Sequence, residues 1–66
     1  MSSKKILELV QNDLTDFISN KYPNGMPNSL LVAQEFILKY PDHGRNYGLS
    51  EINRMIEEGI KQGLFS

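Results

Sequence analysis

The chain has 66 residues, of which 39% are hydrophobic and 23% are charged, and it contains one histidine and no cysteine. This length suits one small domain, because two domains and a linker would need more residues. The lack of cysteine excludes disulfide bonds, and one histidine is too few for the usual zinc ligand sets. We therefore expect a single domain over residues 1–66 that carries no metal and no other cofactor.

The charged residues are almost balanced, with seven Lys and Arg against eight Asp and Glu, so the formal net charge is −1. Nucleic-acid-binding domains usually carry a basic excess, which makes nucleic acid a partner that we do not favour. No stretch approaches the ~18–20 apolar residues of a membrane span. Polar residues from Glu8 onward also interrupt the N-terminal apolar stretch too early for a signal peptide. A cytoplasmic protein without membrane contact is expected.

The first predicted helix covers residues 3–22. Apolar residues spaced by three and four place a single stripe on it: Ile6, Leu7, Val10, Leu14, Phe17 and Ile18. Ser2 or Ser3 can cap its start. Pro23 ends it at Tyr22, because the residue before a proline is pushed out of the α region.

The second predicted helix covers residues 29–40, with Asn28 or Ser29 as its cap and Pro41 as its end. Its predicted core side consists of Ser29, Leu30, Ala33, Phe36, Ile37 and Tyr40. The short apolar run over residues 30–38 also fits a β-strand. Its Ala, Gln, Glu and Leu content favours a helix.

The third predicted helix covers residues 49–63 and follows an irregular loop over residues 41–48, in which proline and glycine are helix breakers. One face of this helix repeats Leu49, Ile52, Ile56, Ile60 and Leu64. Gly59 and Gly63 on the same face predict a close helix approach or an early end at Gly63. The whole pattern predicts an all-α fold, a compact three-helix domain.

Catalytic groups are sparse in this sequence. His43 beside Asp42 is the one histidine neighbourhood, and adjacent residues seldom orient each other as a catalytic base and its partner do. Glu57 and Glu58 are consecutive, so they point about 100° apart on a helix and cannot act as a pair. We expect that the protein is not an enzyme.

The loop before the third helix is a candidate anion site, composed of His43, Arg45, Tyr47, Gly48 and Ser50. Free N–H groups at a helix start, together with an arginine, suit a phosphate or a carboxylate. The spacing is not that of a nucleotide-binding Walker loop. We favour the simpler interpretation, a glycine-hinged connection between helices that binds no ligand.

Apolar residues on a polar helix face indicate a contact with another protein. Leu31 and Leu38 lie two helical turns apart among polar residues, here Gln34 and Glu35, and Phe65 follows near the end of the chain. Such residues need a cover that a small core does not supply. We predict an interaction module, a regulator or inhibitor, that binds another protein or itself, with a homodimer or larger as the free state.

A small DNA-binding regulator of the helix-turn-helix type is the alternative function. The second and third helices would form the motif, and the candidate reading residues are Ser50, Asn53, Arg54, Lys61 and Gln62. The predicted connection of about eight residues is longer than the usual three or four. Three carboxylates, on Glu51, Glu57 and Glu58, would also face the DNA phosphates. Retention on DNA that falls with salt would distinguish this function from protein binding.

Overall fold

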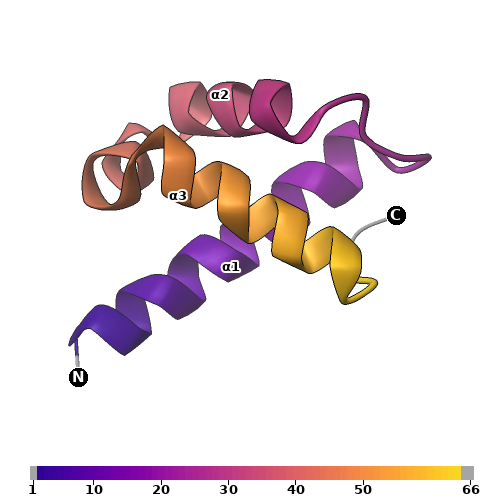
Figure 1. The fold of residues 1–66 in the computed structure, drawn as a ribbon. Coiled ribbons are helices and arrows are strands. Elements are labelled where there is room, and N and C mark those ends of the chain that lie inside the picture. The colour runs from indigo at the N-terminus through magenta and orange to yellow at the C-terminus, as the bar shows by residue number, and fades with distance from the viewer. Residues whose placement is uncertain (1, 65–66) are drawn as a thin grey trace.

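Three helices make up the computed structural model, which describes residues 2–64 and, within the first helix, side chains from residue 5 onward. They are α1 (Ser2–Lys21), α2 (Ser29–Lys39) and α3 (Pro41–Lys61), and no strand occurs in the described part. The all-α three-helix prediction is confirmed. The described molecule measures 34 × 22 × 19 Å, and its long dimension reflects α1, since 20 helical residues span about 30 Å (Figure 1).

Helix α1 buries most of the stripe that its sequence predicts, and Ile6 and Leu7 at its start are half-buried. The buried residues are Val10, Leu14, Phe17 and Ile18. The helix ends at Lys21, and the following Tyr22 still donates its N–H to the Ile18 carbonyl at 2.8 Å. Gly25 makes the turn, with a φ of 118° that side chains rarely adopt. The predicted cap at Ser2 or Ser3 lies outside the described side chains.

Helix α2 is capped by Asn28, whose side-chain oxygen accepts the N–H groups of Leu30 at 2.8 Å and Leu31 at 3.2 Å. The helix ends at Lys39, because Tyr40 precedes Pro41 and takes a non-helical φ of −124° and ψ of 72°. Both ends agree with the prediction within one residue. The strand alternative for this segment is wrong.

The buried side of α2 is turned relative to the prediction. Val32, Ala33 and Phe36 are buried, whereas Leu30, predicted to be in the core, is 45% exposed. The Phe36 ring meets Phe17 of α1 edge to face, with centroids 5.7 Å apart. This large aromatic contact determines which side of α2 faces inward, and it brings Val32 to the core instead of Leu30.

Helix α3 begins at Pro41, so the predicted irregular loop over 41–48 is wrong for residues 41–47. Proline suits the first position of a helix, because its missing N–H has no helical partner there. Asp42 adds a negative charge in the first turn, which the helix dipole favours. Gly48 alone breaks the helix, with a φ of 75° and a ψ of 168°. The proline and the glycines that predicted a loop therefore belong to a helix that is interrupted only at Gly48.

The predicted apolar face of α3 is buried only in its middle. Ile52 and Ile56 are fully buried and Gly59 is buried, while Leu49 and Ile60 are exposed and Leu64 is 64% exposed. Figure 1 shows α3 crossing α1 at an angle, so the two helices lie close together over only part of their length. The repeat of apolar residues on this face therefore corresponds to core only at Ile52 and Ile56.

The end of α3 has the hydrogen bonds of a Schellman cap. The Leu64 N–H donates to the Gly59 carbonyl at 2.8 Å, and the Gly63 N–H donates to the Ile60 carbonyl at 3.1 Å. Gly63 takes a φ of 76°, the left-handed geometry that this cap requires. The predicted early end at Gly63 is confirmed.

Gly44 lies where the first part of α3 approaches α2. A Cβ atom added to this glycine would lie 2.5 Å from the Cγ2 atom of Ile37. Real side chains do not approach so closely, so the backbone of α3 reaches this position because residue 44 has no side chain. Gly44 therefore serves helix packing.

Candidate functional site

Four side chains on one side of α2 make up what we call the α2 outer face: Leu31, Gln34, Glu35 and Leu38. Leu38 is 83% exposed, Leu31 is 44% exposed, Gln34 is exposed and Glu35 is half-buried. The structure thus brings together the four described residues of the predicted partner site. The fifth, Phe65, lies outside the described residues.

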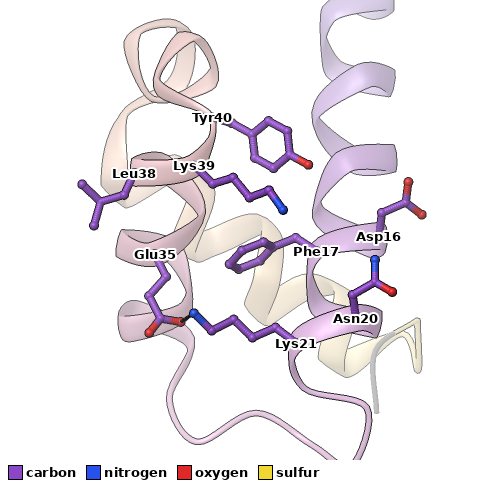
Figure 2. Close-up of a pocket in the computed structure, with 8 residues that line it drawn as sticks. All are labelled: Asp16, Phe17, Asn20, Lys21, Glu35, Leu38, Lys39 and Tyr40. Atoms are coloured by element: carbon purple, nitrogen blue, oxygen red, sulfur yellow. Dashed lines mark ion pairs between the residues drawn. The ribbon is translucent and has the colours of Figure 1, made fainter.

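An open groove of about 730 Å³ runs beside this face, between the second half of α1 and α2 (Figure 2). We call it the α1–α2 groove, and its lining residues are Asp16, Phe17, Asn20, Lys21, Glu35, Leu38, Lys39 and Tyr40. Glu35 and Leu38 belong both to the groove and to the α2 outer face. Figure 2 shows the Leu38 side chain pointing away from α1, so the groove and the α2 outer face lie on adjacent sides of α2.

The floor of the groove is the buried ring of Phe17, with one lysine ammonium from each helix near it. Lys21 Nζ lies 5.7 Å from the ring centroid and Lys39 Nζ lies 5.8 Å from it. Lys39 Nζ also lies 5.8 Å from the centroid of Tyr40. Aromatic faces attract cations at these distances, so the rings hold the two ammonium groups over the groove.

Glu35 is held by two groups from the end of α1. The Tyr22 hydroxyl donates a hydrogen bond of 2.5 Å to Glu35 Oε1, and Lys21 Nζ lies 3.4 Å from the same oxygen. The hydrogen bond from Tyr22 lowers the pKa of Glu35 most, burial acts in the opposite direction, and Lys21 lowers the pKa further. The same hydrogen bond, burial and the Glu35 charge raise the pKa of Tyr22. Glu35 is thus a charged carboxylate already occupied by Tyr22 and Lys21.

Lys39 has no carboxylate within ion-pair distance among the described residues. Asp16 lines the α1 wall of the groove, but Figure 2 shows its carboxylate pointing away from both ammonium groups. One positive charge in the groove therefore lacks a counter-charge in the described part of the chain. Sequence reasoning missed Lys21 and Lys39 as site residues, because they belong to different helices and meet only when α1 packs against α2.

His43 and Arg45, two members of the predicted anion loop, each contact a carboxylate. His43 Nε2 lies 2.7 Å from Asp13 Oδ2 of α1, and its ring stacks on Phe36 with centroids 5.7 Å apart. Arg45 pairs with Asp42 one turn away, and both side chains are exposed. The structure does not bring His43 and Arg45 to a common point.

The other members of the predicted anion loop are Tyr47, Gly48 and Ser50. Tyr47 packs against the core, Gly48 forms the kink in α3, and Ser50 is exposed beyond it. Anion binding by this segment stays a prediction, and it now concerns a kinked helix with an exposed Arg45–Asp42 pair.

The arrangement of α2 and α3 differs from that of a helix-turn-helix motif. α2 and the 49–61 part of α3 are joined by the helical segment 41–47, where the motif has a turn of three or four residues. Among the candidate reading residues, Asn53 is half-buried and its Oδ1 atom is enclosed. Glu51, Glu57 and Glu58 are all exposed, so three carboxylates would lie on the surface offered to DNA.

Within the described residues, no three His, Asp or Glu side chains are grouped as metal ligands would be. No helix in this part of the chain has both the length and the apolar content that crossing a membrane requires. Comparison of the chain with protein-family models, with curated proteins and with solved structures finds no match.

Proposed function

We propose that the protein is a non-enzymatic, cytoplasmic interaction module that binds a second copy of itself through the α2 outer face. The observation that carries this proposal is the 83% exposure of Leu38, in line with the half-covered Leu31. Covering a fully exposed leucine contributes about 1.5–3 kcal/mol. Two leucines on one helix face thus provide a driving force for association.

The arrangement of the α2 outer face suits a two-fold symmetric contact. Leu31 and Leu38 are equally distant from the point between Gln34 and Glu35. In an antiparallel pair of α2 helices about this point, Leu31 of one copy meets Leu38 of the other. The Gln34 amide then lies near the Glu35 carboxylate of the second copy and can donate a hydrogen bond to it. The face is therefore complementary to itself.

A regulatory or inhibitory role on another protein belongs to the same proposal, since that protein would cover the same leucines. DNA binding is the competing function, and the exposed carboxylates of α3 count against it. The two functions differ in their dependence on salt, because contacts to phosphates weaken steeply as salt rises.

Sedimentation equilibrium at about 100 µM tests the proposal, since a contact worth about 5–6 kcal/mol is populated at that concentration. We expect a dimer for the wild type and a monomer for Leu38→Glu and Leu31→Glu. Leu9→Glu is the matched control: Leu9 is 52% exposed but lies on α1, away from the α2 outer face. Circular dichroism of each variant verifies that it remains folded.

A monomeric wild type at this concentration would contradict self-association. An equal loss of dimer in Leu9→Glu and Leu38→Glu would show that the contact is not made by α2. Retention of the wild type on DNA that falls with salt, without any dimer, would favour the helix-turn-helix alternative.

A further inference from the structure

A second groove, of about 540 Å³, lies between the first half of α1 and the second half of α3. We call it the α1–α3 groove, and its floor consists of Leu7, Leu14, Met55 and Gly59. It shares no lining residue with the α1–α2 groove or with the α2 outer face. Whatever binds here therefore leaves the proposed dimer contact free.

The floor of the α1–α3 groove is apolar and only partly covered by the fold. Leu14 and Gly59 are buried, whereas Leu7 and Met55 are half-buried. Leu64, which follows the end of α3 and also lines the groove, is 64% exposed. A ligand with an apolar surface gains free energy by covering these side chains.

Two carboxylates, on Glu51 and Glu58, line the α3 side of this groove. Both side chains are exposed, and neither has an ion-pair partner among the described residues. They are seven residues apart, so they lie two helical turns, about 10 Å, from each other along α3. The α1 side has the uncharged polar residues Gln11 and Thr15. Cationic groups of a ligand therefore belong at the α3 side.

Arg54 also lines the groove, but it lies farther from the apolar floor than the two carboxylates do. At about 100° per residue, Glu51 and Glu58 fall between Met55 and Arg54 around the helix. Arg54 forms no ion pair with either of them in the described structure. A ligand that covers Met55 therefore meets two unpaired carboxylates before it meets Arg54.

We infer that the α1–α3 groove binds an amphipathic helix of a partner protein, which carries two basic residues seven positions apart beside an apolar stripe. The stripe covers Leu7 and Met55, and the two basic residues pair with Glu51 and Glu58. Residues seven apart on a helix share a face, and their spacing equals that of the two carboxylates. The inference goes beyond self-association, because the α2 outer face takes no part in it.

Charge complementarity favours a basic helix of another protein over the other occupants. A nucleic acid would bring phosphates to the two carboxylates and would offer no apolar stripe. A second copy of this chain has one pair of basic residues seven positions apart, Arg54 and Lys61. The apolar residues of that helix, Ile52 and Ile56, are fully buried in its own core. A second copy therefore cannot present the pair together with an apolar stripe.

The probe is a display library of random 16-residue peptides, selected against the full chain at low salt. We expect enriched peptides with two Lys or Arg seven positions apart and Leu, Ile, Met or Phe between them. Fluorescence anisotropy then measures one such peptide against variants. Glu51→Gln and Glu58→Gln should each weaken binding about threefold, the loss of one exposed ion pair, and the double variant about tenfold. A peptide with Glu at both basic positions should bind the double Glu→Lys variant instead of the wild type.

Glu57→Gln is the matched control, because Glu57 precedes Glu58, is also exposed and lies outside the α1–α3 groove. Its affinity for the peptide should equal that of the wild type. The inference is overturned if no peptide with the expected spacing is enriched, or if Glu57→Gln and Glu58→Gln bind alike. Equal binding of a peptide whose apolar residues are replaced by Ser would also overturn it, because the groove floor would then play no part.

The two proposals fail separately. Leu38→Glu should lose the dimer in sedimentation equilibrium and keep its peptide affinity, whereas Glu58→Gln should lose peptide affinity and keep the dimer. A monomeric wild type with Glu58-dependent peptide binding would retain the groove and reject self-association. A dimer that the Glu51→Gln and Glu58→Gln double variant loses would assign the groove to a second copy and overturn the inference.

Discussion

Gly44 offers a test of the helix packing, because the structure predicts that the effect of Gly44→Ala depends on one neighbour. In an unobstructed helix, replacing glycine by alanine stabilises by about 1 kcal/mol. At Gly44 the new Cβ atom would lie 2.5 Å from Ile37 Cγ2, so the Ile37 side chain or the two helices must shift. Such overpacking costs about 1–3 kcal/mol. Gly44→Ala should therefore lower the free energy of unfolding by up to about 2 kcal/mol.

The same substitution should have the opposite sign when Ile37 is alanine. Ile37→Ala removes both γ carbons that the new Cβ atom would meet, and the gain of about 1 kcal/mol in helix propensity then remains. The coupling between the two sites should be about 1–3 kcal/mol. Urea unfolding of the wild type, both single variants and the double variant measures this coupling. A common concentration of trimethylamine N-oxide keeps the weaker variants folded.

Gly48→Ala is the control, because nothing lies within 4 Å of a Cβ atom at Gly48, while its φ of 75° disfavours any side chain. It should cost about 1–3 kcal/mol in both backgrounds. If Gly44→Ala destabilised the wild type and the Ile37→Ala variant by the same amount, the contact between residues 44 and 37 would be refuted. Stabilisation by Gly44→Ala in the wild-type background would refute it as well.

Two further predictions concern the core and the α1–α2 groove. Ile56 is fully buried in the middle of α3, so Ile56→Ala should lower the free energy of unfolding by ~2–5 kcal/mol. Lys61 is exposed, so Lys61→Ala should change the free energy of unfolding little. Equal urea midpoints for the two variants would contradict the burial of Ile56. The Tyr22–Glu35 hydrogen bond lowers the pKa of Glu35 from 4.5, so the stability that it contributes is present above pH 4.5 and is lost as the pH falls below this value. The same bond raises the pKa of Tyr22 from 10.0, so that stability is present below pH 10.0 and is lost as the pH rises above it. Tyr22→Phe should therefore flatten both limbs of the pH–stability profile measured by thermal unfolding, and unchanged limbs would show that the bond does not affect stability.

The features that the sequence predicted correctly depend on neighbouring residues. The buried stripe of α1, the cap at Asn28 and the end of α2 before Pro41 each follow from a spacing or a side chain within one or two turns. The end at Gly63 has the same origin, since only a glycine adopts its left-handed geometry without strain. The residues within one or two helical turns were therefore enough to predict these features.

The errors arose where contacts between helices decided the outcome. Val32 replaced Leu30 in the core because Phe36 packs on Phe17, a contact between residues far apart in the chain. Gly44 looked like a loop breaker, whereas it allows α3 to approach Ile37. Periodicity gives the width of an apolar stripe, but the packing partners determine which edge of it is buried.

One part of the candidate site follows from spacing within a single helix, and the other part depends on contacts between helices. Leu31 and Leu38 lie on one helix, so their exposure among polar residues could be predicted from spacing alone. Lys39 drew no attention in the sequence, where a lysine at a helix end usually serves the helix dipole. Lys39 has no carboxylate partner among the described residues because Glu35, the acidic residue of its own helix, is held by Lys21 of α1 and by the following Tyr22.

The pairing of Glu35 with α1 explains why the groove is left with a positive charge. On an isolated α2 helix, Glu35 and Lys39 would be four residues apart and would form the usual ion pair. In the folded chain Glu35 turns to Tyr22 and Lys21, and Lys39 Nζ lies over Phe17 and Tyr40 instead. Tyr22→Phe should thus weaken the hold on Glu35 and allow it to compete for Lys39. The hydroxyl of one tyrosine outside the groove thereby influences whether Glu35 is available to pair with Lys39.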